Sequence, residues 1–281
     1  MLKYIAVSII GLGQIGGSLG LALKSKSLKG RYHITGIERK KDALNTALKI
    51  KAVDDASSSL QSAKNADIVV ICTPVDTIAS IYKELVKIVR QSAIITDTGS
   101  VKYQIEKEII AFAKNRNYAS FVGSHPVAGK EKNGILSADA KMFKDAKVII
   151  TTLSKKVEKK EMVVVRMWKD TGADVVAMSA KKHDELVALT SHVPHVIAFL
   201  LNKIYQKTNK KNPQIGMLTA GSFKGITRVA VSSVDMWAPI FVTNSKNVGR
   251  YLTELIGELV LFKKNLRDKQ KIKKEILNTQ K

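Results

Sequence analysis

The 281-residue sequence predicts an α/β protein in which an N-terminal Rossmann-type domain with a mostly parallel sheet precedes an all-helical C-terminal domain. Up to residue 178, short β-rich runs alternate with helical patterns, which is typical of a parallel sheet with crossover helices. A glycine-rich turn separates the first β-rich run from the first helical run, as in dinucleotide-binding folds. After residue 179 the β pattern disappears. We therefore expect two domains, over 1–178 and 179–281.

The predicted elements of the first domain are short and end at turn signals. Strands are expected where β-branched and aliphatic residues gather, over 4–10, 33–37, 68–72, 93–96, 121–123, 147–151 and 174–178. Helices long enough to serve as crossovers are expected over 40–51, 77–90 and 101–115.

The second domain begins with one long amphipathic helix. Its apolar residues recur at steps of three and four and so form a single stripe: Leu186, Leu189, Val193, Ile197, Leu200 and Ile204. Helical or mixed apolar patterns continue over 212–228 and 233–265. The basic segment 263–281 is expected to be a solvated tail or a frayed helix.

The net charge is the unusual feature of the composition. Lys and Arg number 47 against 24 Asp and Glu, a formal net charge of +23, which favours nucleic acid, acidic membrane surfaces or anionic small molecules as partners. No basic patch interleaved with aromatic residues is visible, so nucleic acid is not the expected partner. The single Cys72 cannot close a disulfide within the chain and offers no thiolate metal site. The composition favours a cytoplasmic protein with no metal.

The uncharged run over 6–23 is similar in length to a secretory or membrane segment. Five glycines interrupt it where a strand would have to turn into a helix. We therefore expect a strand, a turn and a helix, and no membrane segment.

The glycine-rich turn has the pattern GxGxxG. Its first glycine permits a tight turn, the second lets the backbone approach a pyrophosphate, and the third lets the helix pack closely on the strand. Backbone N–H groups at the start of the helix then face the phosphates. The predicted cofactor-binding residues of this turn are Gly11, Gly13, Gln14, Ile15 and Gly16.

Glu38 ends the second predicted strand, where a carboxylate can accept hydrogen bonds from the adenosine ribose and would repel a 2′-phosphate. This favours NAD as the cofactor. NADP stays open, because the basic residues at 39–41 could meet a 2′-phosphate. Thr73 and Pro74 follow another strand and form either a ligand-binding edge or a plain turn that ends the strand.

Two further segments carry polar groups at predicted strand ends. Ser100 joins a strand to a helix and is by default an N-cap, although its hydroxyl could also face a ligand. His125 lies at the carboxyl end of another strand, held extended by the proline that follows.

The helical half carries a second polar group of residues. Ser191 and His195 are four apart and share one helix face, while Pro194 between them removes a helix hydrogen bond. Arg228 lies in an otherwise apolar run, and a buried arginine requires an anion.

Taken together, the chain resembles the prephenate dehydrogenase and arogenate dehydrogenase family. The resemblance runs from residue 5 to about 260 through five stretches, GLGQIGGSLGLAL, DTGSVK, GSHPVAGKEKNG, HDELVALTSHVPHVIAFLL and GSFKGITRVAVSSVDMWAPIF. It implies the NAD(P)-dependent oxidative decarboxylation of a cyclohexadienol in tyrosine biosynthesis, and a homodimer formed through the helical half. Prephenate and arogenate both remain possible substrates.

The resemblance also implies roles for residues at matching positions. His125 resembles the base that takes the proton of the ring hydroxyl, and Ser100 the hydroxyl that orients it. His195 and Arg228 are similar to the substrate-binding pair, with Ser191 on the same helix face as His195. Glu131 matches an acidic position near the pocket entrance, and Trp237 an aromatic residue that can reach the neighbouring subunit.

Two rival functions remain at this stage. A nucleic-acid-binding protein on a Rossmann-like scaffold would need its basic residues on one face. A two-domain dehydrogenase that acts on hydroxy acids or imines would need a catalytic lysine, whereas here the helical half supplies a histidine and an arginine.

Overall fold

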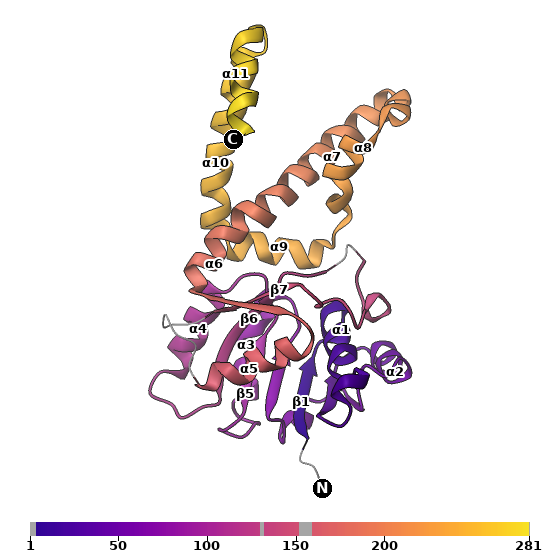
Figure 1. Cartoon of the computed structure of the whole chain (residues 1–281), viewed down its shortest axis with the longest axis vertical. Coiled ribbons are helices and arrows are strands. Elements are labelled where there is room, and N and C mark those ends of the chain that lie inside the picture. The colour runs from indigo at the N-terminus through magenta and orange to yellow at the C-terminus, as the bar shows by residue number, and fades with distance from the viewer. Residues whose placement is uncertain (1–3, 130–131, 152–158, 281) are drawn as a thin grey trace.

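The computed structural model describes residues 4–129, 132–151 and 159–280, and its N-terminal half is built on one eight-stranded sheet (Figure 1). The strand order is β3-β2-β1-β4-β5-β6-β7-β8. The strands are β1 (Ile5–Ile10), β2 (Tyr32–Ile37), β3 (Asp55–Ser57), β4 (Ile68–Ile71), β5 (Ile94–Asp97), β6 (Ser120–Pro126), β7 (Lys147–Thr151) and β8 (Asp174–Met178).

The sheet is parallel except where β6 meets β7. All seven expected strands are present within a few residues of their expected bounds, and the mostly parallel Rossmann-type sheet is confirmed. Strand β3 was not predicted. It has three residues, two of them polar, so it lacks the apolar run that identifies a buried strand from sequence.

Helices cover both faces of the sheet. The buried cluster on one face includes residues of α1 (Gln14–Leu23), α2 (Lys41–Lys49) and α5 (Lys159–Asp170). The cluster on the other face includes residues of α3 (Ile78–Leu85) and α4 (Tyr103–Ala113). Helix α3 ends five residues earlier than expected. The uncharged run over 6–23 forms β1 and α1 inside this domain.

The helical half begins with a continuous helical segment interrupted by a bulge. Helix α6 (Ala180–Val187) passes through a π-helical turn, η5 (Ala188–His192), into α7 (Val193–Lys211). The chain returns along α7 through three short helices: η6 (Pro213–Leu218), α8 (Gly221–Thr227) and η7 (Arg228–Val231). It continues through α9 (Val234–Thr243), α10 (Ser245–Asn265) and α11 (Lys269–Thr279). The basic C-terminal segment is therefore helical, with the Asp268 side chain accepting hydrogen bonds at the start of α11.

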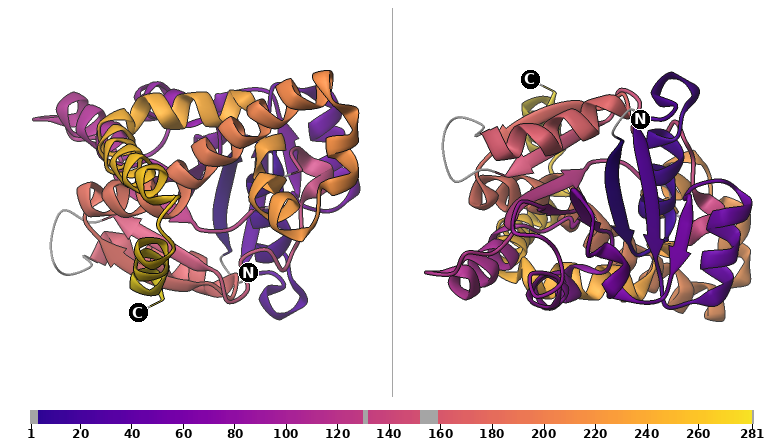
Figure 2. Two further views of the ribbon diagram at one scale, coloured as in Figure 1. Left: turned by 90° about the horizontal axis from the view of Figure 1, so that it is seen from above. Right: turned by 90° about the horizontal axis from the view of Figure 1, so that it is seen from below.

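Helix α9 lies across the edge of the sheet, and two arms extend away from it, α7 with α8 and α10 with α11 (Figure 1). Seen from above, these helices lie over one edge of the sheet (Figure 2, left). Trp237 and Ile240 of α9 belong to the same buried cluster as Val75 and Ile78 of the first domain. This contact seats the helical half on the half that contains the sheet.

The apolar stripe predicted for the long helix is largely uncovered in the single chain. Val193 is buried, but Leu200 is 53% exposed and Ile204 is 63% exposed. The facing arm also exposes apolar side chains, including Val260 and Leu261 of α10. Large contiguous apolar surfaces of this kind mark protein or membrane contacts.

By length and composition, the segment Ala180–Lys211 could cross a membrane. Its first half, however, buries His183, Asp184 and His192 in hydrogen bonds, and Asp184 reaches the backbone of the first domain. These contacts make it an integral helix of the two-domain fold.

Candidate active site

The polar residues singled out from sequence converge at one edge of the sheet. Strands β1, β4, β5 and β6 are parallel, so their carboxyl ends meet at the same edge, where open α/β sheets bind ligands. The loop that starts at Gly11 follows β1, Thr73 follows β4, Ser100 follows β5, and His125 is the second-last residue of β6. The helical half covers this edge.

A cavity of about 1160 Å³ opens at the glycine-rich turn. Gly11 has a φ of +91°, and a Cβ there would lie 2.8 Å from the Cys72 carbonyl oxygen. A Cβ on Gly16 would collide with the Gly11 carbonyl, whereas a Cβ on Gly13 would meet no atom within 4 Å. The first and third glycines therefore close the turn, and the second leaves open space for a pyrophosphate. The residues present fit a dinucleotide.

Glu38 is held at the rim of this cavity by backbone hydrogen bonds. One carboxylate oxygen accepts from the N–H of Leu12 at 3.1 Å, and the other accepts from Arg39 at 2.8 Å and Lys40 at 3.1 Å. A carboxylate fixed here can accept ribose hydroxyls and opposes a 2′-phosphate. The exposed side chains of Arg39 and Lys40 line the same cavity.

Thr73 and Pro74 line the same cavity from the β4 side. The Thr77 hydroxyl donates to Thr73 Oγ1 at 2.8 Å, which fixes that side chain at the start of the next turn. On the opposite side, the Gln14 amide donates to the Lys132 carbonyl at 2.6 Å. This bond ties the loop after β6 to the glycine-rich turn.

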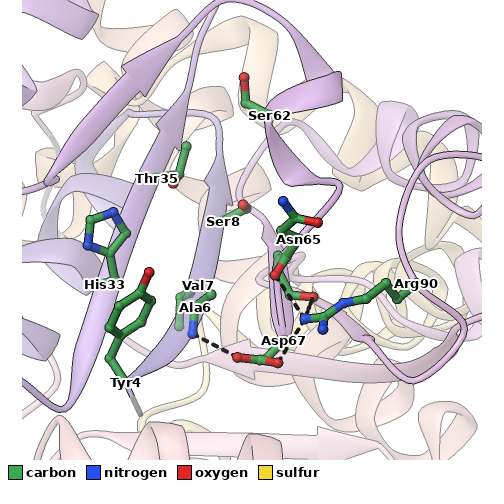
Figure 3. Close-up of a pocket in the computed structure, with 11 residues that line it drawn as sticks. Tyr4, Ala6, Val7, Ser8, His33, Thr35, Ser62, Asn65, Asp67 and Arg90 are labelled. Atoms are coloured by element: carbon green, nitrogen blue, oxygen red, sulfur yellow. Dashed lines mark hydrogen bonds and ion pairs between the residues drawn. The ribbon is translucent and has the colours of Figure 1, made fainter. Parts of the chain in front are cut away.

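A second cavity, of about 590 Å³, lies towards the other end of the strands (Figure 3). Arg90 lines this cavity, and its guanidinium donates to the Asn65 carbonyl at 2.9 Å and to the Asp67 carboxylate at 3.0 Å. The other carboxylate oxygen of Asp67 accepts from the N–H of Ala6 at 2.9 Å. Its ionic groups thus bond to each other, at the edge where α/β folds do not bind their ligands.

His125 is partly buried and hydrogen-bonded to a second histidine. Its Nδ1 lies 2.8 Å from Nε2 of His183, and the two rings meet edge to face. Burial lowers the pKa of His125 well below its usual value, and the charges of His183, Lys102 and His192 act in the same direction. A neutral imidazole in this position can accept a proton.

A buried network lies beneath His125. Lys102 forms an ion pair with Asp97 and donates to the Ser124 carbonyl at 2.9 Å. Asp97 also accepts from the N–H groups of Ser124 and Gly99 at 3.1 and 3.0 Å. The network fixes the backbone on either side of the strand ends that carry Ser100 and His125.

The default expectation that Ser100 caps the following helix is wrong. Helix α4 begins at Tyr103, and its first N–H groups donate to Asp184 of α6, from Lys102 at 2.8 Å and from Tyr103 at 2.9 Å. A carboxylate at a helix N-terminus is stabilised by the unsatisfied N–H groups there. The Ser100 side chain is thus not used as the cap.

The second polar group forms around the π-helical turn. Nδ1 of His195 lies 2.9 Å from the Ser191 carbonyl, so this nitrogen donates and Nε2 is left as the acceptor. The His195 ring stacks on Trp237 with ring centroids 3.6 Å apart. Burial lowers the pKa of His195, and the bond to Ser191 opposes this shift. Ser191 and His195 therefore interact through the backbone of one and the ring of the other.

Trp237 is 6% exposed, and its indole nitrogen is the one buried side-chain polar atom in the described ranges with no hydrogen-bond partner. Besides His195, it contacts the His192 ring edge to face. Burial lowers the pKa of His192 to about 4 against the effect of Asp184. In the single chain, Trp237 thus packs in the interior of its own subunit.

Arg228 begins η7, which packs against α7, the helix that carries His195. The expectation of a buried arginine is wrong for the single chain, where Arg228 is exposed. An apolar sequence neighbourhood predicts burial only if those apolar residues are themselves covered, and Ile226 and Val231 are exposed too. Glu131 lies outside the described residues.

Sequence reasoning did not assign roles to several residues of this site. Two of them, His183 and Asp184, begin the motif HDELV, and Lys102 ends the motif DTGSVK. The signal that could have found the first two was a histidine next to a carboxylate on a predicted helix. Asn244, whose amide donates to the Asp184 carbonyl at 2.8 Å, lies in no such motif. In the part of the chain that is described, no three His, Cys, Asp or Glu side chains form a metal-binding group.

Two family models match the chain. The nucleotide-binding domain of prephenate dehydrogenase matches residues 19–177, and the dimerization domain of prephenate dehydrogenase matches residues 179–277.

Individual proteins give the same match. A prephenate dehydrogenase of Bacillus subtilis is 34% identical over 257 residues, which cover 90% of this chain and 68% of the relative. A cyclohexadienyl dehydrogenase of Zymomonas mobilis is 31% identical, over 90% of this chain and 85% of the relative. The crystal structure of prephenate dehydrogenase from A. aeolicus with hydroxyphenyl propionate and NAD+ superposes with a TM-score of 0.87 at 28% identity, covering 99% and 97% of the two chains.

Proposed function

The chain belongs to the prephenate dehydrogenase family, and we propose that it catalyses the NAD-dependent oxidative decarboxylation of prephenate to 4-hydroxyphenylpyruvate, a step of tyrosine biosynthesis. The observation that carries this proposal is the convergence, at one sheet edge, of a cavity shaped for a dinucleotide and a neutral, partly buried histidine. Arogenate is the alternative substrate. Prephenate is favoured because relatives that are 34% and 29% identical to this chain are prephenate dehydrogenases.

NAD supplies the hydride acceptor when it is bound. The residues placed to hold it are Gly11, Gly13, Gln14, Ile15, Gly16, Glu38, Thr73 and Pro74. Glu38 disfavours NADP through its fixed carboxylate. The nucleotide-binding family model and the NAD+ in the related crystal structure agree with this assignment.

The reaction needs one proton acceptor and a means of holding two carboxylates. His125 takes the proton of the ring hydroxyl as a hydride leaves the carbon that bears this hydroxyl. The electrons of the bond to the ring carboxylate then enter the ring as carbon dioxide departs, and the phenolic oxygen recovers the proton from His125. Aromatisation supplies the driving force, so the protein mainly orients the reactants and stabilises charge.

Substrate binding is assigned to the helical half. His195 presents Nε2, Ser191 and Trp237 fix its ring, and Arg228 holds a carboxylate through a two-pronged hydrogen bond. Ser100 orients His125 and the substrate from the β5 loop. The role of Glu131, an acidic position near the pocket entrance in the family, rests on its motif position alone. The other roles rest on motif position and on the elements that carry these residues.

The chain forms a homodimer through residues 179–281. The family model for this half is a dimerization domain, and the exposed apolar residues of α7 and α10 support the same contact. The domain boundary at 178/179 coincides with the end of β8 at Met178. We assign the chain to the cytoplasm because it uses NAD and because its single cysteine, Cys72, can form no disulfide within the chain.

The proposal is tested by a steady-state assay that crosses prephenate and arogenate with NAD and NADP. We expect the highest kcat/KM with prephenate and NAD. His125→Asn, purified in the same way, controls for contaminating host dehydrogenase. Activity with neither cyclohexadienyl substrate would overturn the assignment, and a preference for arogenate would replace the substrate.

A further inference from the structure

His183 lies directly behind the proposed base. Its Nε2 is 2.8 Å from Nδ1 of His125, and its side chain is only 1% exposed. The bond joins α6 of the helical half to β6 of the nucleotide-binding half. A buried ring nitrogen that contacts the base from another domain can control which nitrogen of the base carries the hydrogen.

Asp184 determines the hydrogen positions of both rings. Its Oδ1 lies 2.8 Å from Nδ1 of His183. A carboxylate accepts hydrogen bonds and donates none, so Nδ1 of His183 carries the hydrogen, and its Nε2 is left to accept from His125. His125 must then donate from Nδ1, which leaves its Nε2 free to take a proton.

Asp184 is itself fixed by three hydrogen bonds from two other elements. The N–H groups of Lys102 and Tyr103 donate to its carboxylate at the start of α4, and the Asn244 side chain donates to its backbone carbonyl. Asp184 is 3% exposed. Hydrogen bonds therefore run without a break from the start of α4 through Asp184 and His183 to His125.

We propose that His183 and Asp184 are positioning residues that hold His125 in the tautomer required of a base; this rests on the proposed function of His125. When the ring hydroxyl gives its proton to Nε2 of His125, the imidazolium keeps its Nδ1–H bond to His183, and the negative charge of Asp184 stabilises it through that ring. One proton moves, from the substrate oxygen to His125, and none leaves His183 or Asp184. The logic is that of an aspartate that orients a catalytic histidine in a serine protease.

Two variants of His183 separate this role from a purely structural one. In His183→Asn, the amide nitrogen replaces Nδ1 and can still bond Asp184, but the side chain is too short to reach His125. In His183→Gln, the amide can place its oxygen near the former Nε2 and accept from His125, although it cannot titrate. We expect kcat to fall by about 10²–10⁴-fold in the asparagine variant, by comparison with loss of an orienting aspartate, and to stay within tenfold of wild type in the glutamine variant.

The KM for prephenate and the affinity for NAD should change little in either variant. Thermal unfolding monitors whether both are folded. His33→Asn is the matched control, because His33 also bonds an aspartate, Asp55 at 2.7 Å, but lies beside the second cavity (Figure 3). We expect its kcat to equal that of wild type.

Asp184→Asn provides an independent test of the same proposal. Its amide oxygen can still accept from Nδ1 of His183 and from the N–H of Lys102, which share Oδ1 in the wild type, but the negative charge that stabilises the His125 imidazolium is lost. We expect a loss of kcat comparable to that of His183→Asn. A double variant, His125→Asn with His183→Asn, should be no slower than His125→Asn alone, since His183 acts through His125.

The proposal is overturned if folded His183→Asn and Asp184→Asn keep wild-type kcat, if folded His183→Gln loses as much as His183→Asn, or if the double variant shows the full additive loss. Failure of the proposed function gives a different result. In that case His125→Asn itself keeps its turnover, or the wild-type enzyme does not oxidise prephenate.

Discussion

The imidazole of His125 is neutral in the resting enzyme because burial opposes its protonation, and the charge of Lys102 acts in the same direction. A general base contributes most when it is unprotonated at the working pH and can still accept a proton in the transition state. The depressed pKa gives the first condition. The bond from its Nδ1 to His183 directs the accepting nitrogen towards the site.

His125→Asn should retain NAD binding and lose about 10²–10⁴-fold in kcat, because asparagine keeps a hydrogen-bonding group but accepts no proton. Steady-state kinetics and NAD titration measure the two effects separately. For the wild type, kcat/KM should be flat across neutral pH and fall only on the acid side of pH 6.5, since the pKa of His125 lies below that value. Near-wild-type turnover in the variant would place the base elsewhere.

Glu38→Ala should raise kcat/KM with NADP relative to NAD. The substitution removes both the ribose acceptor and the repulsion of a 2′-phosphate, while Arg39 and Lys40 remain at the cavity to attract it. The measurement is kcat/KM with each cofactor, and Asp42→Ala, which removes a carboxylate from the same cavity wall, is the control. A wild-type preference for NADP would contradict this account of Glu38.

At the scale of elements, two glycines in the turn from β1 to α1 have different roles: Gly16 is needed for folding, and Gly13 for cofactor binding. Gly13→Ala should leave the melting temperature close to that of wild type, because its Cβ meets no atom within 4 Å, but it should weaken NAD binding by filling the space for the pyrophosphate. Gly16→Ala should destabilise the fold, because its Cβ collides with the Gly11 carbonyl. Thermal unfolding and NAD titration of both variants test the distinction. Equal NAD affinity in Gly13→Ala and wild type would contradict it.

The long helix of the second domain accommodates a proline by forming a bulge. Pro194 cannot donate the hydrogen bond that a helix interior requires, and the chain responds with the π-helical turn Ala188–His192 just before it. Such turns often occur at functional sites. Here the turn carries Ser191 and His192 and leads directly to His195.

A buried carboxyl gives the first domain a pH-dependent stability. Burial raises the pKa of Glu106 to about 7 against the effect of a hydrogen bond from Thr151. Between pH 4.5 and 7 the folded chain therefore holds a proton that the unfolded chain releases, so the free energy of unfolding falls as pH rises. His192, with its pKa lowered to about 4, acts in the opposite direction between pH 4 and 6.5.

Glu106→Gln should remove the first contribution and leave the second. Relative to wild type, the free energy of unfolding of the variant should therefore increase between pH 4.5 and 7, by about 3 kcal/mol from a shift of about 2.5 pKa units. Urea unfolding at a fixed protein concentration across this range is the measurement. Parallel pH profiles for the two proteins would show that Glu106 does not hold the proton.

At the scale of the whole molecule, the single chain leaves the apolar residues of its arms uncovered. We expect light scattering at micromolar concentration to give about twice the chain mass of 30.9 kDa. Leu200→Lys with Ile204→Lys should reduce the mass to that of one chain, because both side chains are more than half exposed and a lysine would be desolvated in the contact. Lys203→Glu, on the same helix, is the control. A wild-type protein that stays monomeric would contradict the dimer.

Much of the nucleotide-binding half could be predicted from local patterns. The strands were identifiable because central parallel strands are buried on both faces and so consist of continuous apolar residues, and GxGxxG marked the turn because few other residues fit its close contacts. The edge strand Asp55–Ser57 was not predicted, since an exposed three-residue strand owes its existence to its neighbour β2.

The sequence by itself determined the two-part architecture, the dinucleotide turn and the identity of the histidines and the arginine, because each depends on residue type and spacing along the chain. Only the tertiary structure decided that Asp184 rather than Ser100 caps α4, that His183 bonds His125, and that Arg228 is exposed in the single chain. These facts depend on contacts between residues as many as 82 positions apart. Such contacts are set by how α6 and α9 pack on the sheet edge, and no local periodicity encodes that packing.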